Sequence, residues 1–226
     1  MFYQHGLISR RKAVRGACAQ LMFRLTGASH RRMERVRDQV SSMCRGWPAT
    51  QVSEIVSANL ARVIGPYIYA EARRLVETHL DAGHDVIIVS TSGQEMVGPI
   101  GGLLGATAVI ATQMEIEDGL YTGRARFYAY GPAKAAGVRE LAELRGYRLA
   151  ECYAYSDSVT DLPLLEVVGH PRAVNPDRAL RKVAKARGWP VLAFGRTRPA
   201  QRPPGVAGLP TNGDKAPGND PPAPGM

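Results

Sequence analysis

Cysteines, long apolar runs and a leader-like start are scarce or absent in this chain of 226 residues. The three cysteines, Cys18, Cys44 and Cys152, are odd in number and form no C-x-x-C pair, which argues against a disulfide framework and a zinc site. No run approaches the roughly 18 apolar residues that span a membrane, and residues 1–6 lack the apolar stretch of a signal peptide. With 45% apolar and 22% charged residues, the sequence predicts a cytoplasmic globular protein with one sizeable core.

Acidic residues are scarce in the first quarter of the chain. Residues 1–60 carry ten basic side chains against Glu34, Asp38 and Glu54. A surplus of this kind can attract nucleic acid, anionic lipid or a polyanionic substrate. However, apolar residues keep helical spacing through the same region, and no aromatic side chains alternate with the basic ones to stack on bases. The pattern predicts solvated faces of amphipathic helices and argues against nucleic acid as a partner.

Helical spacing dominates residues 8–66, and helix and strand patterns alternate after residue 67. We expect helices around Lys134 and over residues 69–80, 94–104 and 162–168. We expect strands over residues 85–90, 108–115, 120–128, 152–155 and 172–174. The turn Glu117-Asp118-Gly119 indicates a hairpin, and Asn175-Pro176 indicates a helix start. The alternation predicts an α/β fold with a parallel, doubly wound sheet whose site lies at the carboxyl ends of the strands.

Proline and glycine crowd the end of the chain, and hardly any apolar periodicity remains after Phe194. A segment of this composition cannot bury enough surface to offset its chain entropy. We therefore predict that residues 197–226 form a disordered tail.

Two carboxylates, Asp157 and Asp161, follow an apolar and aromatic run that predicts a buried strand. On a helical turn, the i, i+4 spacing would put both on one face, where like charges destabilise a bare helix by roughly a few tenths of a kcal/mol. A hard cation such as Mg²⁺ would relieve that repulsion and take oxygen ligands. Two aspartates that cap helices in a solvated loop are the alternative, and the pair alone does not decide between these interpretations.

Hydroxyl groups and a lysine offer a second sign of an anion site. The strand predicted over residues 85–90 ends in Ser90, Thr91 and Ser92 before a helix, and backbone N–H groups with a hydroxyl at such a junction can hold a phosphate. The same residues could merely cap the helix. Lys134 falls in the first turn of another predicted helix, where a cation opposes the helix dipole. It either points into solvent or serves an anion at that end.

Hydroxyl, lysine and paired acids in this order and with these spacings resemble the haloacid dehalogenase superfamily, specifically its phosphoserine-phosphatase-like subfamily IB hydrolases of actinobacterial type. The resemblance runs from near the first residue to about Phe194 and includes residues 45–48, 88–93, 128–134, 154–157 and 173–177. It implies that Ser90, Thr91 and Lys134 bind phosphate, with Ser90 and Lys134 catalytic. It further implies that Asp157 and Asp161 hold Mg²⁺, and that a helical cap (1–66) precedes a Rossmann-like core (67–196).

One motif of that family is missing. Its members begin with a strand that ends in Asp-x-Asp-x-Thr, whose first Asp attacks phosphorus and whose second is a general acid and base; these 226 residues contain no Asp-x-Asp. In the family this strand is central in the sheet, so its loss would leave apolar strand edges uncovered. We therefore expect the genomic reading frame to continue upstream of Met1 for on the order of 20 residues, roughly a strand and a turn, and to encode this motif.

The resemblance predicts a Mg²⁺-dependent phosphomonoester hydrolase that acts on a small-molecule phosphate ester through an aspartyl-phosphate. The 226-residue chain itself would be inactive, because the attacking Asp is absent. A catalytically dead phosphate-binding or regulatory protein is the alternative, and a basic nucleic-acid-binding helical module is a third interpretation. The cap arginines Arg37, Arg45 and Arg62 are candidates for binding the substrate, although surface arginines without that role are the more common case.

Overall fold

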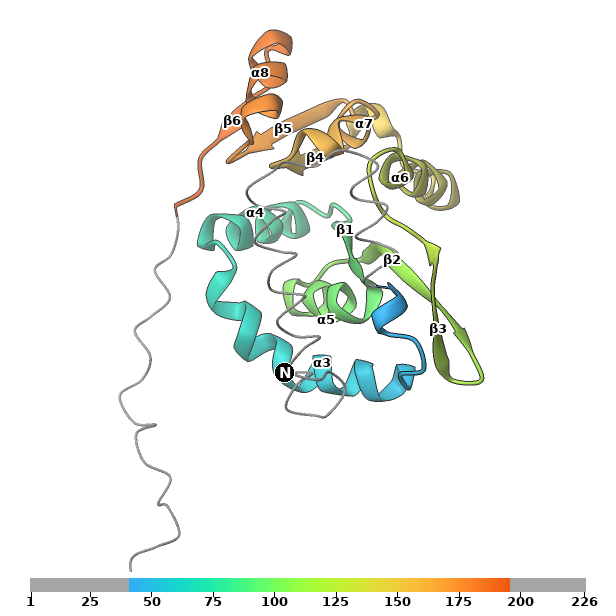
Figure 1. Ribbon diagram of the computed structural model, residues 1–226. Coiled ribbons are helices and arrows are strands. Elements are labelled where there is room, and N and C mark those ends of the chain that lie inside the picture. Colours follow the sequence, from blue (N-terminus) through green and yellow to red (C-terminus); the bar gives the residue numbers. More distant parts are fainter. Residues whose placement is uncertain (1–40, 196–226) are drawn as a thin grey trace, which may run out of the picture.

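Helices and strands alternate along the computed structural model (Figure 1), which describes residues 41–195 apart from the side chains of residues 60–62. Its helices are α3 (Ala49–Ile64), α4 (Ala70–Asp81), α5 (Gln94–Leu104), α6 (Pro132–Arg145), α7 (Leu162–Leu165) and α8 (Arg178–Arg187). Its strands are β1 (Ile87–Gly93), β2 (Ala108–Glu117), β3 (Leu120–Phe127), β4 (Tyr153–Ser156), β5 (His170–Val174) and β6 (Val191–Leu192). Short 3-10 turns are η1 (Gly65–Tyr67), η2 (Leu149–Glu151) and η3 (Val159–Asp161). Within this part of the chain, no helix has the length and apolar character needed to cross a membrane.

The strands form two half-sheets of three strands each. In the first, β1 pairs in parallel with β2, and β2 pairs antiparallel with β3. In the second, β4, β5 and β6 run parallel in that order. The α/β prediction is confirmed. β1 and β4 each end a half-sheet, and within residues 41–195 neither has a strand on its outer edge.

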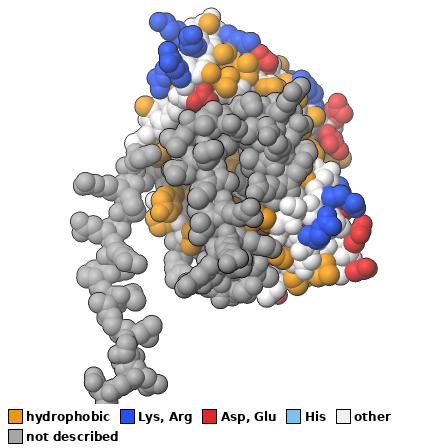
Figure 2. Space-filling view, viewed as in Figure 1, with side chains coloured by type: hydrophobic (Ala, Val, Ile, Leu, Met, Phe, Trp, Pro, Cys, Tyr) orange, Lys and Arg blue, Asp and Glu red, His pale blue; other side chains and the backbone are white. Residues whose placement is uncertain are grey.

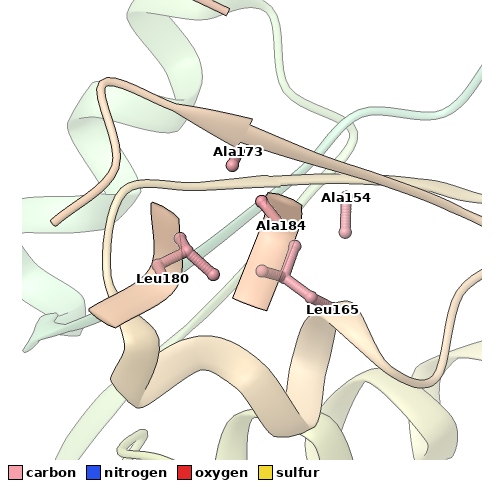
Figure 3. Close-up of a cluster of buried hydrophobic side chains, with 5 residues drawn as sticks. All are labelled: Ala154, Leu165, Ala173, Leu180 and Ala184. Atoms are coloured by element: carbon pink, nitrogen blue, oxygen red, sulfur yellow. The ribbon is translucent and has the colours of Figure 1, made fainter. Parts of the chain in front are cut away.

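Small and large apolar side chains fit together beside the second half-sheet (Figure 3). Ala154 on β4 and Ala173 on β5 lie with Leu165 of α7 and with Leu180 and Ala184 of α8. Leu165 and Leu180 are both 0% exposed. The alanines leave room for α8 to approach the strands, and the leucines fill that space. Burial of each leucine contributes about 2 kcal/mol, so this core fixes β4 and the residues that follow it.

The β2–β3 hairpin is tied to the chain that leads into α3. Asp118 and Gly119 in its turn have φ of 50° and 77°, which the favoured two-residue hairpin turn requires; the predicted hairpin is confirmed. The Gly46 N–H donates to the Tyr121 carbonyl at 2.8 Å, and the Tyr121 N–H donates to the Trp47 carbonyl at 3.0 Å. The segment before α3 therefore runs beside β3 as a short extra strand would.

Tyr121 also joins α3 to the start of α5. Its ring packs with Val52 and Val56 of α3 and is 3% exposed. Its hydroxyl donates to Glu95 Oε1 at 2.6 Å. Burial raises the pKa of the Tyr121 phenol far above its ordinary value, and the Glu95 carboxylate adds to the rise. Because Glu95 lies in the first turn of α5, directly after β1, this contact holds the hairpin against the end of β1.

Helix α8 begins later than the sequence predicts. Its N-cap is Asp177, whose carboxylate accepts from the Leu180 N–H at 2.7 Å, so the start predicted at Asn175-Pro176 is wrong. Asn175 has a φ of 43°, and its side-chain amide exchanges hydrogen bonds with the Phe194 backbone. Asn and Asp are both good caps, and the contact with Phe194 decides between them. Helix α7 is also shorter than predicted and ends at Leu165.

Helix α8 carries its basic residues on the face opposite the core. Figure 2 shows Lys and Arg side chains at the top of the molecule, where α8 lies in the same view of Figure 1. Its exposed basic residues are Arg178, Arg181, Lys182, Lys185 and Arg187. Of these, Arg187 pairs with Glu166 at 2.6 Å. This is the solvated face of an amphipathic helix.

Several predictions fall outside the described residues. They are the helices expected before residue 41, with most of the basic residues of that region, and the disordered tail of residues 197–226. Of the predicted cap arginines, Arg37 and the side chain of Arg62 also lie outside, and Arg45 is exposed. These expectations stay predictions.

Candidate functional site

The predicted site residues lie after β1, after β4 and at the start of α6. Ser90 and Thr91 belong to the last part of β1, and Asp157 directly follows β4. Lys134 lies in the first turn of α6, and Asp161 ends η3. An ion pair between Lys134 and Asp161 brings the start of α6 against the loop after β4.

Lys134 is buried, with 7% of its surface exposed. Its Nζ donates to Asp161 Oδ1 at 2.8 Å, so of the two predicted alternatives it does not point into solvent. The Ser156 hydroxyl donates to the other carboxylate oxygen, Asp161 Oδ2, also at 2.8 Å. A buried ammonium without a counter-charge is costly. Asp161 compensates this charge and fixes where the ammonium lies.

Ser156, the last residue of β4, is a site residue that the sequence analysis missed. It is 9% exposed, and its oxygen also accepts from the Ser158 N–H at 3.3 Å. A serine in a strand has no pattern of its own. One signal was available: the alternation along β4 puts Ala154 and Ser156 on the same buried face, and a hydroxyl there needs a partner.

The two acids of the pair differ in their surroundings. Asp157 is exposed, and its carboxylate makes no hydrogen bond or ion pair with another described residue. It lies in the loop before η3, so the expectation that both acids share one helical face is wrong. The Asp157 carbonyl accepts from the Asp177 N–H at 2.7 Å, and Asp177 Oδ2 accepts from the Val159 N–H at 2.9 Å. Asp177, which the sequence analysis did not assign to the site, therefore holds the loop of residues 157–161 against the start of α8.

The hydroxyl groups at the end of β1 are used differently. Ser90 Oγ accepts from the Ser92 N–H at 3.2 Å, which leaves the Ser90 proton for another acceptor. Thr91 Oγ1 donates to the Ala129 carbonyl at 2.8 Å, so its proton is already used within the protein. Ser90 is the better placed of the two to donate to an anion.

Tyr130 lies close to the ion pair, in the loop that leads into α6. Burial raises the pKa of its phenol, and the negative charge of Asp161 adds to the rise. Its ring stacks on that of Tyr128, with centroids 5.7 Å apart. At neutral pH the phenol therefore keeps its proton.

Oxygen ligands for a cation are present in part. Mg²⁺ is usually held by one or two carboxylates, while phosphate and water complete its octahedron. Asp157 offers an exposed carboxylate, whereas both oxygens of Asp161 already accept hydrogen bonds from Lys134 and Ser156. Within residues 41–195, no three His, Cys, Asp or Glu side chains gather into a metal site. The residues fit a Mg²⁺ ion bound through Asp157 that takes its other ligands from outside this set.

The sequence profile of the haloacid dehalogenase-like hydrolases matches residues 1–166 of the chain. The chain belongs to this family. This haloacid dehalogenase-like hydrolase is 57% identical over 208 residues to the inhibition of morphological differentiation protein of Streptomyces azureus, a match that covers 91% of this chain and 75% of that protein. It is 52% identical over 195 residues to a protein of Mycobacterium tuberculosis (strain H37Rv) named probable phosphatase, covering 86% of this chain and 68% of that protein.

A solved structure from Bordetella pertussis Tohama I, described as a protein with unknown function, has the same fold. Its TM-score is 0.71 at 30% identity, and the match covers 80% of this chain and 82% of that chain. The resemblance stated from the sequence is therefore confirmed, and the haloacid dehalogenase-like chain is a hydrolase by family.

Proposed function

We propose that this chain is the scaffold of a Mg²⁺-dependent phosphomonoesterase that acts in the cytoplasm on small phosphate esters. The observation that carries the proposal is the buried chain from Ser156 through Asp161 to Lys134, with 2.8 Å at each step. It holds a positive charge at the start of a helix, where the dipole alone would oppose it. The family membership and the relative named a phosphatase support the same reaction.

Lys134 and Ser90 would bind the phosphoryl group. A lysine ammonium has three N–H donors, and the contact with Asp161 uses one of them. The remaining donors can neutralise phosphoryl oxygens, and Ser90 can add its hydroxyl proton. Stabilisation of this kind, with donors fixed in advance, is the main source of catalysis in phosphoryl transfer.

The bond-making group would be an aspartate carboxylate that attacks phosphorus. The bond from phosphorus to the ester oxygen breaks, a second carboxylic acid protonates the leaving alcohol, and an aspartyl-phosphate forms. Water then hydrolyses that intermediate. Of the paired acids, neither suits the attack. Asp161 is held by Lys134 and Ser156, and Asp157 is assigned to the metal. The 226 residues contain no Asp-x-Asp, so we propose that this chain alone does not turn over phosphate esters.

Mg²⁺ would supply positive charge beside the phosphoryl oxygens when bound. Asp157 would hold it, since its carboxylate is exposed and unpaired within the described part of the chain. Asp161 would act on the metal site through its position in the same loop, while its direct contact is with the lysine.

Among the described residues, the outer edges of β1 and β4 have no neighbouring strand, which supports a place there for the motif-bearing strand. Both strands end a half-sheet, and both lead directly into site residues. A strand between them would present its last residues beside Ser90 and Asp157. This is the position at which an attacking carboxylate is needed, and we propose it as the position of the missing motif.

Binding of inorganic phosphate tests the proposed phosphate site without requiring turnover. We expect the 226-residue chain to bind phosphate, measured by NMR titration, and Ser90→Ala to weaken that binding by roughly tenfold. Arg187→Ala, at an exposed residue of α8 that pairs with Glu166 and takes no part in the proposed site, is the control and should bind as the wild type does. Equal binding by Ser90→Ala would remove Ser90 from the site.

A catalytically dead phosphate-binding or regulatory protein remains the second candidate, because the sequence lacks the attacking motif. The two candidates agree on phosphate binding and differ on turnover. An array of phosphate esters, tested with and without Mg²⁺ on a chain extended by the Asp-x-Asp strand, separates them. Tight phosphate binding without any turnover by the extended chain would favour the second.

A further inference from the structure

Strand β1 bulges at its carboxyl end, next to the proposed phosphate site. Ser90 pairs with Ala111 of β2, and Gly93 pairs with the next residue, Thr112. Thr91 and Ser92 therefore have no opposite residues on β2. A bulge of this kind re-aims the strand and leaves backbone groups without their ladder partners. Each such buried group needs another partner.

The Thr112 hydroxyl supplies that partner. Thr112 Oγ1 donates to the Thr91 carbonyl at 2.7 Å and accepts from the Ala129 N–H at 3.2 Å. The Thr91 hydroxyl donates to the Ala129 carbonyl at 2.8 Å. Thr112 is 7% exposed and Ala129 is 0% exposed. These hydrogen bonds form a closed ring among β1, β2 and the loop before α6.

The ring connects the two segments that carry the proposed phosphate donors. Thr91 follows Ser90 directly, and Ala129 lies in the loop that leads to Gly131, the N-cap of α6, whose first turn holds Lys134. The Thr112 hydroxyl bonds to both segments, and the Thr91 hydroxyl adds a direct bond between them. The position of the Ser90 hydroxyl relative to the Lys134 ammonium therefore depends on this ring, in which Thr112 makes two of the three bonds.

We infer that Thr112 is a positioning residue of the phosphate site: its hydroxyl holds the end of β1, which carries Ser90, and the loop before α6, which leads to Lys134, at a fixed separation. The inference rests on the proposed function for its link to phosphate, while the positioning itself can be measured without it. Thr112 is buried and its hydroxyl is used by Thr91 and Ala129, so it would act without contacting the substrate. It acts because a single hydroxyl both donates to one loop and accepts from the other, which a valine of the same shape cannot do.

Hydrogen exchange of the Ala129 amide tests the positioning directly, because that amide donates to Thr112. In the full 226-residue chain, Thr112→Val should speed its exchange by at least roughly tenfold, since the amide loses a buried acceptor. Thr112→Ser keeps the hydroxyl and should stay within about twofold of wild type. The Leu180 amide, which bonds to Asp177, should not change in either variant.

Thr122→Val is the matched control. Its hydroxyl donates to Glu115 on the outer part of the hairpin, so removing it should leave the Ala129 exchange unchanged. If Thr112→Val does not fold, Thr91→Val breaks only the bond to the Ala129 carbonyl and should speed exchange of the same loop. Unchanged Ala129 exchange in Thr112→Val, or equal loosening by Thr112→Ser, would overturn the inference.

Titration with inorganic phosphate tests the consequence. Thr112→Val should weaken binding by roughly fivefold or more, and Thr112→Ser should restore it. Wild-type affinity in Thr112→Val would overturn the link between positioning and phosphate. If Ser90→Ala binds phosphate as the wild type does, the proposed function fails at that site. The exchange rates would still decide whether Thr112 holds the two loops together.

Discussion

Lys134 Nζ lies 2.8 Å from Asp161 Oδ1, and both side chains are nearly buried, at 9% and 13% exposed. Each charge would be energetically unfavourable at its position without the other. The first turn of α6 opposes a cation, and a buried carboxylate without a donor is costly. Together they fix an ammonium group beside the loop after β4. The pair therefore explains why a lysine occupies a position where a helix normally favours an acid.

Breaking this pair should destabilise the protein. Asp161→Asn leaves the Lys134 charge buried without compensation, and we expect it to lower the free energy of unfolding by about 3 kcal/mol. Urea unfolding followed by circular dichroism measures this.

Asp157→Asn is the matched control for that experiment. Asp157 is exposed and has no partner within the described residues, so its neutralisation should change stability by less than about 0.5 kcal/mol. Equal losses in the two variants would contradict the different roles assigned to the two acids.

Asp157, whose substitution should hardly affect stability, should matter strongly for activity if it binds the metal. In an enzyme that carries the complete set of motifs, Asp157→Asn should abolish Mg²⁺-dependent turnover, because it removes both charge and a ligand. Ser158→Ala should matter much less, since the Ser158 hydroxyl bonds to the Thr160 N–H, the Thr160 hydroxyl and Asp177 and is not a proposed metal ligand. Initial rates at saturating Mg²⁺ measure both. Full activity in Asp157→Asn would remove this residue from the metal site.

Asp177 should give the fold a dependence on acid pH. Burial acts to raise the pKa of Asp177, but hydrogen bonds from the Leu180 and Val159 N–H groups outweigh it and lower the pKa. Its contribution to stability is therefore complete above the unfolded pKa of about 3.9 and is lost as pH falls through the lower folded value.

The capping role of Asp177 can be measured by substitution. Asp177→Ala should cost about 1 kcal/mol at neutral pH, whereas Asp177→Ser keeps a capping oxygen and should cost less. The urea concentrations at half-unfolding of the wild type and of both variants, measured near neutral pH and at about pH 3, give these losses of stability. The Asp177→Ala deficit should shrink at the lower pH; a deficit that does not change with pH would count against the carboxylate as the source.

Tyr121 should give a dependence on alkaline pH. Its folded pKa is raised, first by burial and then by Glu95, so the folded state keeps the phenol proton after the unfolded chain has lost it at about pH 10. The stability that this provides is complete below that pH and falls as pH rises above it. Tyr121→Phe should therefore lose less stability than wild type between about pH 8 and pH 11. Tyr67→Phe, at a residue 72% exposed, should follow wild type.

Local signals predicted most of the elements correctly. Asp118 and Gly119 adopt the positive φ that their turn requires, and α5 spans Gln94–Leu104, as predicted from the helix-like stretch that follows Gly93. The start of α8 could not be read locally, because Asn175 and Asp177 are both capping residues. The choice between them depends on Phe194 and Val159, which are distant in sequence.

The sequence analysis named the acids, the lysine and the hydroxyl as site residues, and this assignment stays a prediction; it did not find the contacts that hold these side chains in place. The contact of Lys134 with Asp161 joins residues 27 positions apart, and no spacing rule gives it. Ser156 and Thr112 look like ordinary strand residues in the sequence. Their roles depend on a strand end and on a bulge, which appear only when neighbouring strands are in register.

Turnover of phosphate esters with and without a supplied first motif tests the central claim most directly. The 226-residue chain and a chain extended at its start by about 20 residues, forming an apolar strand that ends in Asp-x-Asp-x-Thr, would be assayed on the same esters with Mg²⁺ and with chelator. We expect hydrolysis by the extended chain in Mg²⁺ alone, and none by the shorter chain. Equal turnover by the two chains, or no turnover by a folded extended chain, would contradict this account.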